Sequence, residues 1–216
     1  MIRTNTNDGV AEISLDRADK RNAMTPEMAD AFVRAIESAN ENNAARAILV
    51  RGEGDAFCAG FDLKMCYETD GTLEALLRGL SEAVRSMRRC SKPVILAAHG
   101  AAIAGGCAML GGADYVVTER NAKLGYPVVS LGISPAVSAP TLVRSTGAGN
   151  ARERLLEPRV FGGEEALRIG LAHECVADAH ECAGRSRELA YRFASKPTGA
   201  MQATKRWLNE VDSTDR

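Results

Sequence analysis

Strand-like and helix-like patterns of hydrophobic residues alternate along the first half of the chain. Strands are predicted where apolar and polar residues alternate, as in residues 9–16, or where a short apolar run lies between turn residues. The run at residues 93–98 is apolar enough to be buried on both faces of a sheet. The predicted strands are residues 9–16, 45–51, 93–98, 115–118 and 173–177, with a short extended segment at 123–127.

Helices are predicted where hydrophobic residues recur three and four positions apart. The first is well marked, because Thr25 can cap it, Pro26 suits its first position and the apolar period continues to Ile36. The other predicted helices are residues 72–90, 107–110, 135–145, 150–156, 163–169, 179–194 and 198–211. Strands that alternate with helices, followed by a mostly helical second half, indicate one α/β domain with a helical appendage.

Composition and charge narrow the class of protein. Hydrophobic residues make up 45% and charged residues 25% of the 216 positions, as in an ordinary globular domain. The net charge of −1 provides no overall field that attracts nucleic acid or an acidic membrane. The six cysteines form no C-x-x-C pair, and no apolar run reaches about 18 residues. We therefore expect a cytoplasmic protein with reduced thiols, no metal site, no nucleic-acid partner and no membrane partner.

Two glycine-containing turns follow predicted strands and are the first candidates for chemistry. The first turn is residues 55–64 and the second turn is residues 99–107, which leads into a short helix. Glycine lets backbone approach a ligand closely, and two amides from separate turns suit a developing oxyanion. Such junctions are also common as purely structural features of α/β proteins. A dinucleotide site is disfavoured, because the glycines do not follow G-x-G-x-x-G.

Several blocks of sequence resemble one family. Residues 56–64, which read AFCAGFDLK, closely resemble the first oxyanion turn of the enoyl-CoA hydratase/isomerase (crotonase) superfamily. Residues 103–107, which read IAGGC, resemble the second. The other similar blocks are residues 15–24 (an early CoA-contacting turn), 112–115, 124–132 (a later catalytic turn) and 165–172. They occur in family order over nearly the whole chain, and this order makes the resemblance specific.

The resemblance implies an α/β fold, a crotonase-type spiral of ββα units with a C-terminal helical region, assembled as a homotrimer or hexamer. It implies a single crotonase-like domain over residues 1–216, with the spiral core at about 1–195. Residues 196–216 would be a truncated C-terminal helical trimerisation region. Family members usually continue with further helices, so either the sequence is naturally short or a terminal lid over the site is absent.

The resemblance also implies an acyl-CoA thioester as the ligand, with coenzyme A as part of the substrate and no permanently bound cofactor. The thioester carbonyl would lie between the backbone amides of Phe61 and Gly105, the two catalytic positions. The CoA-binding positions implied are Arg21, Ala23, Ala59, Asp62, Leu63 and Lys64. Lys64 would face the CoA phosphates as a point charge, the alternative being a solvated surface lysine.

The chain departs from the family at both acid–base positions. Hydratases carry one glutamate after the second turn and another in the later turn, and Ala108 and Val128 stand there in this sequence. General acid–base help contributes about 10²–10⁴-fold per group. We therefore expect hydratase activity to be weak or absent, and Val128 also removes the route that single-glutamate isomerases use.

Other groups near the two turns are candidate replacements for the missing glutamates. Tyr126 offers a phenol as an acid, and Cys107 lies at a helix start that would favour a thiolate, although packing roles are more common for both. Glu68 and Asp70 follow the first turn on a predicted mobile loop. The remaining polar residues form no recognisable triad; they are Ser130, Ser134, Ser138 and His99.

Three functions follow from this pattern. The leading hypothesis is an acyl-CoA enzyme that stabilises an enolate or oxyanion and needs little proton transfer, as in decarboxylation. The alternative is a catalytically inactive acyl-CoA-binding or assembly protein. A third is a hydratase or isomerase with a carboxylate from Glu68, Asp70 or a neighbouring subunit. The acyl-pocket walls are expected around residues 65–80 and 130–145.

Overall fold

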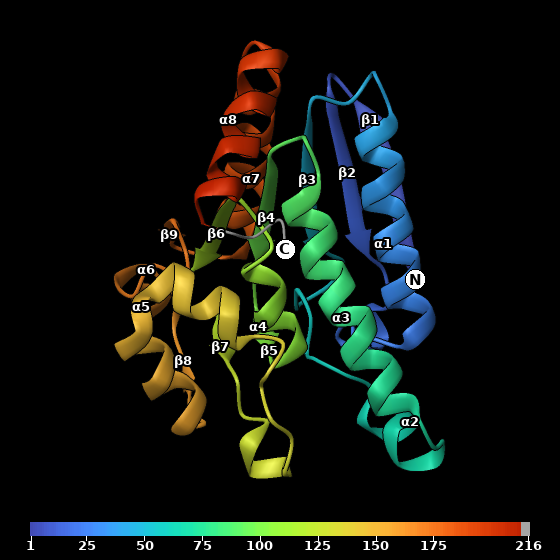
Figure 1. The fold of residues 1–216 in the computed structure, drawn as a ribbon, viewed down its shortest axis with the longest axis vertical. Helices are drawn as coiled ribbons and strands as arrows, with labels where there is room; N and C mark the ends of the chain where they lie inside the picture. Colours follow the sequence, from blue (N-terminus) through green and yellow to red (C-terminus); the bar gives the residue numbers. More distant parts are fainter. Residues whose placement is uncertain (213–216) are drawn as a thin grey trace.

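A six-stranded sheet forms the centre of the molecule in this computed structural model, which describes residues 1–212 (Figure 1). The strands in order are β1 (Ile2–Asn7), β2 (Val10–Leu15), β3 (Ala47–Gly52), β4 (Val94–Ala98), β6 (Tyr115–Glu119) and β9 (Glu174–Val176). β1 pairs with β2 in antiparallel fashion and the other neighbours are parallel. Parallel strands of this kind are buried on both faces, which agrees with the continuous apolar run predicted for β4.

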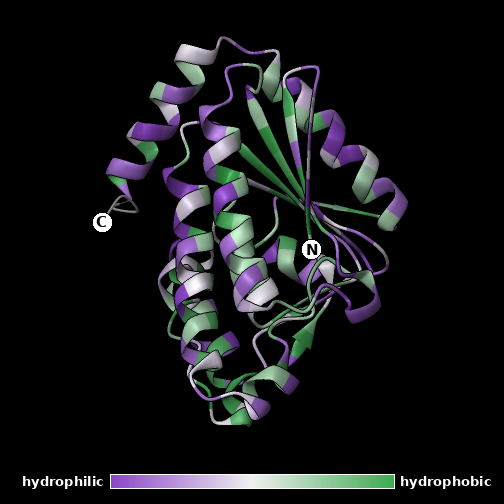
Figure 2. Cartoon of the chain, turned by 90° about the vertical axis from the view of Figure 1, so that its right-hand side faces the viewer, coloured by the Kyte–Doolittle hydropathy of each residue, from purple (hydrophilic) through white to green (hydrophobic). Residues whose placement is uncertain are grey.

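Helices cover both faces of this sheet. Along β3, Ile48 and Val50 point into one hydrophobic cluster while Ala47 and Leu49 point into another, as the two-residue period of a strand requires. Helices α1 (Pro26–Glu41) and α3 (Thr72–Arg89) pack together on the first face, and α7 (Ala179–Ala194) packs against the second. Figure 2 shows the hydrophobic strands enclosed between helices of mixed hydropathy.

A smaller sheet lies beside the large one. It contains β5 (Ala101–Ile103), β7 (Lys123–Gly125) and β8 (Val160–Phe161). The chain runs from β4 to β5 and then into α4 (Gly105–Leu110), returns to the large sheet at β6, and passes to the small sheet again at β7. This repeated winding between two sheets is the spiral expected from the sequence.

The remaining helical elements complete the second half and the connections. They are η1 (Ala18–Lys20), α2 (Leu63–Glu68), η2 (Val129–Leu131), α5 (Ala139–Leu156), α6 (Gly163–Arg168) and α8 (Thr198–Val211). Within residues 1–212, no helix has both the length and the apolar character needed to cross a bilayer. In the same residues, no group of three or more His, Cys, Asp or Glu side chains converges as metal ligands.

The structure corrects several sequence-based boundaries. Of the two residues predicted on a mobile loop after the first turn, Glu68 ends helix α2, and Asp70 lies in the turn between α2 and α3. The helix predicted to start at Pro135 starts at Ala139, and a turn precedes it. Gly147 has φ 79° and ψ 158°, so it interrupts α5 between the two helices that the sequence predicted there. Strands β1, β5 and β8 were not predicted.

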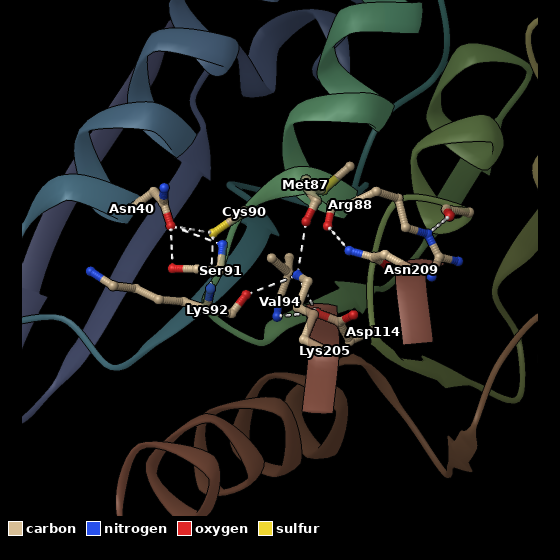
Figure 3. A network of polar contacts seen from close by, with 11 residues as sticks. Asn40, Met87, Arg88, Cys90, Ser91, Lys92, Val94, Asp114, Lys205 and Asn209 are labelled. Carbon is tan, nitrogen blue, oxygen red and sulfur yellow. Dashed lines mark hydrogen bonds and ion pairs between the residues drawn. The ribbon is translucent and has the colours of Figure 1, made fainter. Parts of the chain in front are cut away.

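The C-terminal helix α8 is anchored to the body of the protein by a buried lysine. The Lys205 ammonium donates to the carbonyls of Met87, at 2.9 Å, and Lys92, at 2.8 Å, and pairs with Asp114 at 2.6 Å (Figure 3). A buried cation is tolerated when it is paired and hydrogen bonded in this way. The bounds predicted for this helix are confirmed, whereas a role of residues 196–216 in trimer formation stays a prediction.

Candidate functional site

The two glycine-containing turns lie side by side because their backbones are hydrogen bonded to each other. The Cys58 N–H donates to the Ala101 carbonyl at 2.9 Å, and the Ile103 N–H donates to the Cys58 carbonyl at 3.0 Å. A Cβ atom at Gly106 would lie 2.3 Å from the Cys58 oxygen. This close approach requires glycine at position 106 and fixes the second turn against the first.

The N–H groups of Phe61 and Gly105 are among the backbone amides of these turns that have no partner within residues 1–212. Pairing with Met24 uses the Gly60 carbonyl and the Asp62 N–H, so the Phe61 N–H faces the other way. Gly105 is the first residue of α4, where an N–H has no acceptor inside the helix. Both residues line the same cavity.

The backbone just before Gly105 is strained. Ala104 has φ 52° and ψ −111°, a combination that a residue with a side chain rarely adopts. A Cβ atom at position 105 would lie 2.9 Å from Cε1 of Phe61, so the aromatic ring lies directly against Gly105. The strain and the packing hold the start of α4 in one position relative to the first turn.

The cavity at this junction has a volume of about 210 Å³ and apolar walls. Leu77 and Leu80 of α3 form one side, and residues 131–138 contribute most of the other. Both segments fall where acyl-pocket walls were expected. In the described chain, no Asp, Glu, His, Lys, Arg or Cys side chain lines it, and its polar side chains belong to Tyr126, Ser134 and Ser138.

Tyr126 and Cys107 do not provide a charged group at neutral pH. Burial raises the pKa of Tyr126 well above its usual value, and its hydroxyl donates to the Cys107 carbonyl at 3.2 Å. Burial also raises the pKa of the Cys107 thiol to about 12. The hypothesis of a favoured thiolate at Cys107 is therefore wrong, and the packing role is correct.

The carboxylates considered as replacements lie away from the cavity. Glu68 is at the end of α2, where its carboxylate is 3.7 Å from the Lys64 ammonium, and both side chains are exposed. Neither Glu68 nor Asp70 is among the lining residues. Val128 lines the cavity, whereas Ala108 is buried one turn into α4 and does not reach the wall.

The remaining polar candidates separate in the structure. Ser134 and Ser138 line the cavity and Ser130 does not. The His99 Nε2 atom is 2.9 Å from the Gly54 carbonyl, and His99 does not line the cavity. No imidazole is therefore available to activate either serine within residues 1–212.

The early turn and the first turn are joined, which brings the expected CoA-binding positions together. The Ala59 N–H donates to the Arg21 carbonyl at 2.9 Å. Asp62 caps α2 through the Met65 N–H at 3.4 Å and pairs with Arg17 at 2.7 Å. The Arg17 guanidinium holds the pKa of the Asp62 carboxyl below its usual range. The positions gathered here are Arg21, Ala23, Ala59, Asp62, Leu63 and Lys64.

Two residues that organise this region were not singled out from the sequence. Asn22 is fully buried, accepts from the Arg17 N–H at 2.8 Å and donates to the carbonyls of Glu53 and Ala56 at 2.9 and 2.8 Å. Arg17 also donates to the Ala23 carbonyl at 2.9 Å. Both residues lie in the block that resembles the early turn. A buried polar side chain needs hydrogen-bond partners, so a polar residue in this turn was the sequence signal that could have identified Asn22.

The spiral of two sheets, with an apolar cavity where two glycine turns meet, defines a protein of the crotonase class. The family model described as enoyl-CoA hydratase/isomerase matches residues 5–215, and the chain belongs to this family. It is 30% identical over 209 residues to the crotonyl-CoA hydratase of Syntrophomonas wolfei, covering 95% of this chain and 80% of that protein.

Two further relatives agree with this assignment. The enoyl-CoA hydratase EchA19 of Mycobacterium tuberculosis is 32% identical over 213 residues, covering 93% of this chain and 77% of that one. The crystal structure of an enoyl-CoA hydratase/isomerase from Xanthobacter autotrophicus Py2 superposes with a TM-score of 0.91 at 29% identity, covering 99% and 80% of the two chains. The crotonase-type fold predicted from the sequence is therefore confirmed.

Proposed function

We propose that the protein binds an acyl-CoA thioester whose carbonyl oxygen accepts hydrogen bonds from the N–H groups of Phe61 and Gly105. The observation that carries this proposal is the pair of amides without partners in the wall of an apolar cavity. A buried N–H without an acceptor costs free energy, so a ligand oxygen is the expected occupant. Fixed donors of this kind stabilise charge on that oxygen as it develops.

The proposed reaction is one in which the two amides supply most of the help. Loss of carbon dioxide from an acyl thioester carboxylated at C2 breaks the bond between C2 and the carboxylate and leaves an enolate. Its oxygen would carry the charge that Phe61 and Gly105 stabilise until C2 takes up a proton from water. Hydration, in contrast, needs one group to activate water and another to move a proton. No side chain in the cavity wall of residues 1–212 has an ionised group for either task.

The second candidate is an acyl-CoA-binding or assembly protein without catalysis. The same observation supports it, because the polar side chains of the wall are one buried phenol and two serines without a histidine. The third hypothesis loses its support within residues 1–212, since Glu68 pairs with Lys64 and neither Glu68 nor Asp70 lines the cavity. A carboxylate from a neighbouring subunit would still revive it.

The CoA moiety would follow the joined early and first turns. Backbone groups of Ala23, Ala59 and Leu63 are proposed to contact the adenine, and the exposed Lys64 to face the phosphates. A homotrimer or hexamer, a cytoplasmic location and a part in fatty-acid metabolism are the further expectations for a member of this family.

A pair of variants at position 105 tests the proposal. Gly105→Pro removes the N–H, and Gly105→Ala keeps it while adding the same Cβ contact with Phe61. If the amide serves the carbonyl, the proline variant should lose about 10²–10³-fold more turnover than the alanine variant. The assays are crotonyl-CoA hydration, 3-enoyl-CoA isomerisation and malonyl-type decarboxylation, each with acyl-CoA binding measured alongside.

The outcomes separate the candidates. Decarboxylation that the proline variant loses supports the enzyme, and binding without turnover in any assay supports the non-catalytic protein. Equal activity of the two variants would show that the Gly105 amide has no part in the reaction. A protein that binds no acyl-CoA would overturn both candidates.

A further inference from the structure

A second cavity, of about 190 Å³, adjoins the apolar cavity between α3 and the start of α5. Val137 lines both cavities. Helix α3 also lines both: Leu77 and Leu80 face the apolar cavity, and Arg85 and Arg88 face the second one. The lining of one continuous helix therefore changes from leucine to arginine within about two turns.

The second cavity is strongly basic. Arg85, Arg88 and Arg144 line it, and no Asp or Glu of the described chain does. The Arg85 Nε atom is buried without a hydrogen-bond partner, while its Nη1 atom is 3.8 Å from the Glu82 carboxylate in a loose, exposed pair. The Arg85 guanidinium therefore has a donor left to bind an oxyanion.

Arg88 is held in place from the other side. Its Nε atom donates to the Gly111 carbonyl at 2.8 Å, and its own carbonyl accepts from the Asn209 amide of α8 at 2.7 Å (Figure 3). No carboxylate of residues 1–212 lies within ion-pair distance of its guanidinium. Neutral groups thus hold the Arg88 side chain in place, and its positive charge remains available to a ligand.

We propose that the two cavities together hold an acyl-CoA whose acyl chain ends in a carboxylate, bound by Arg85 and Arg88. This proposal rests on the proposed function, because the thioester end must be at Phe61 and Gly105. A Cβ atom at Gly105 would lie 3.6 Å from Leu80, so Leu80 marks the thioester end of the path.

The distance along α3 sets the length of the acyl chain. Arg85 and Arg88 follow Leu80 by five and eight residues, which is about 7.5–12 Å along the helix axis. An extended chain covers this in roughly six to ten bonds, at the spacing of an extended backbone. The expected acyl groups are therefore of medium length and carry a carboxylate at the far end, in addition to the C2 carboxylate that the proposed decarboxylation removes, rather than a methyl end.

Calorimetric titration with octanoyl-CoA and with the mono-CoA thioester of octanedioic acid tests this inference. The two ligands have the same chain length and differ in the terminal carboxylate. For the wild-type protein, the carboxylated ligand should bind about ten- to a hundredfold more tightly, as a charged hydrogen-bonded pair allows. Arg85→Gln should remove most of this difference and leave octanoyl-CoA binding unchanged.

Arg78→Gln is the matched control, since Arg78 lies on the same helix, is exposed and pairs with Glu74 at 2.7 Å. It should leave both affinities unchanged. Equal affinity of the wild-type protein for the two ligands would overturn the inference and leave the proposed function standing. This comparison needs no variant, so it decides the matter even where Arg85→Gln fails to fold.

Two other results would also overturn it. Binding of neither ligand would remove the proposed function and the inference together. Binding of inorganic phosphate that depends on Arg85, with both thioesters bound alike, would make the second cavity an anion site separate from the acyl chain.

Discussion

Val128 is the residue that most limits the chemistry of this site. It lines the cavity where the family's later glutamate is expected, and its isopropyl group can neither accept nor donate a proton. Ala108, at the other glutamate position, is buried behind the wall. The two departures are therefore unequal, because position 128 faces the cavity and position 108 does not.

Val128→Glu should restore a proton-transfer group at the wall. The apolar surroundings would raise the pKa of the new carboxyl and make it a competent base near neutral pH. We expect 3-enoyl-CoA isomerisation to rise by about 10²-fold or more over the wild-type protein. The assay follows substrate loss over pH, with Val129→Glu, at an exposed neighbouring position, as the control.

No gain with Val128→Glu, in a variant that still binds acyl-CoA, would contradict this role for position 128. Addition of Ala108→Glu tests the harder position. Since Ala108 is 1% exposed, a glutamate there must displace packed atoms, and we expect lower stability before any gain in hydration.

At the scale of the helices and strands, an ion pair of the buried Arg154 links α5 to α6. Arg154 of α5 pairs with Glu165 of α6, and Arg159 pairs with the same carboxylate at 2.6 Å. Hydrogen bonding from Arg159 lowers the pKa of Glu165 below its ordinary value of 4.5. The ionised Glu165 carboxylate therefore stabilises the fold fully above pH 4.5 and less as the pH falls through its lowered pKa.

Glu165→Gln should leave the buried Arg154 guanidinium with only the half-exposed Glu153 carboxylate, 3.0 Å away, as its counter-charge. We expect a loss of about 2 kcal/mol in the free energy of unfolding at pH 7 and a smaller loss below pH 4. Urea unfolding across pH measures both. Glu164→Gln is the control, because that exposed neighbour pairs with Arg120 at the surface, and it should cost less than about 1 kcal/mol. Equal losses in the two variants would contradict the account.

The sequence predicted the elements whose burial gives a clear period. Strands β3 and β4 and helices α1 and α3 were found because their apolar residues face packed neighbours. Strand β1 has almost no buried position and lies at the edge of the sheet, so it carries no hydrophobic alternation. Strands β5 and β8 are three and two residues long, too short for a period to show.

The candidate site divides in the same way. The two turns were located because a glycine motif is local in sequence, and the assignment of Phe61 and Gly105 came from the resemblance. The walls depend on α3 meeting residues 131–138, segments about 50 positions apart that only the fold brings together. The basic cavity beside them was not expected for the same reason.

At the scale of the whole molecule, Lys205 attaches the C-terminal helix α8 to the rest of the protein. Lys205→Met should break the contacts with Met87, Lys92 and Asp114 and cost about 3 kcal/mol or more of unfolding free energy. Hydrogen exchange should show lost protection in α8 before the central sheet. The control is Arg206→Met, whose exposed side chain is 3.9 Å from Glu210; it should cost less than about 1 kcal/mol. Unchanged protection of α8 in Lys205→Met would contradict the anchor.

Residues 1–212 thus present an apolar cavity with two backbone amides in its wall and no acid–base pair. Infrared spectroscopy of octanoyl-CoA labelled with ¹³C at the thioester carbonyl tests this most directly, because the band reports the hydrogen bonds to that oxygen. Bound to the wild-type protein, the band should move to lower frequency, and Gly105→Pro should reverse most of that shift while Gly105→Ala does not. A bound ligand whose carbonyl band stays at its solution position would contradict the central claim.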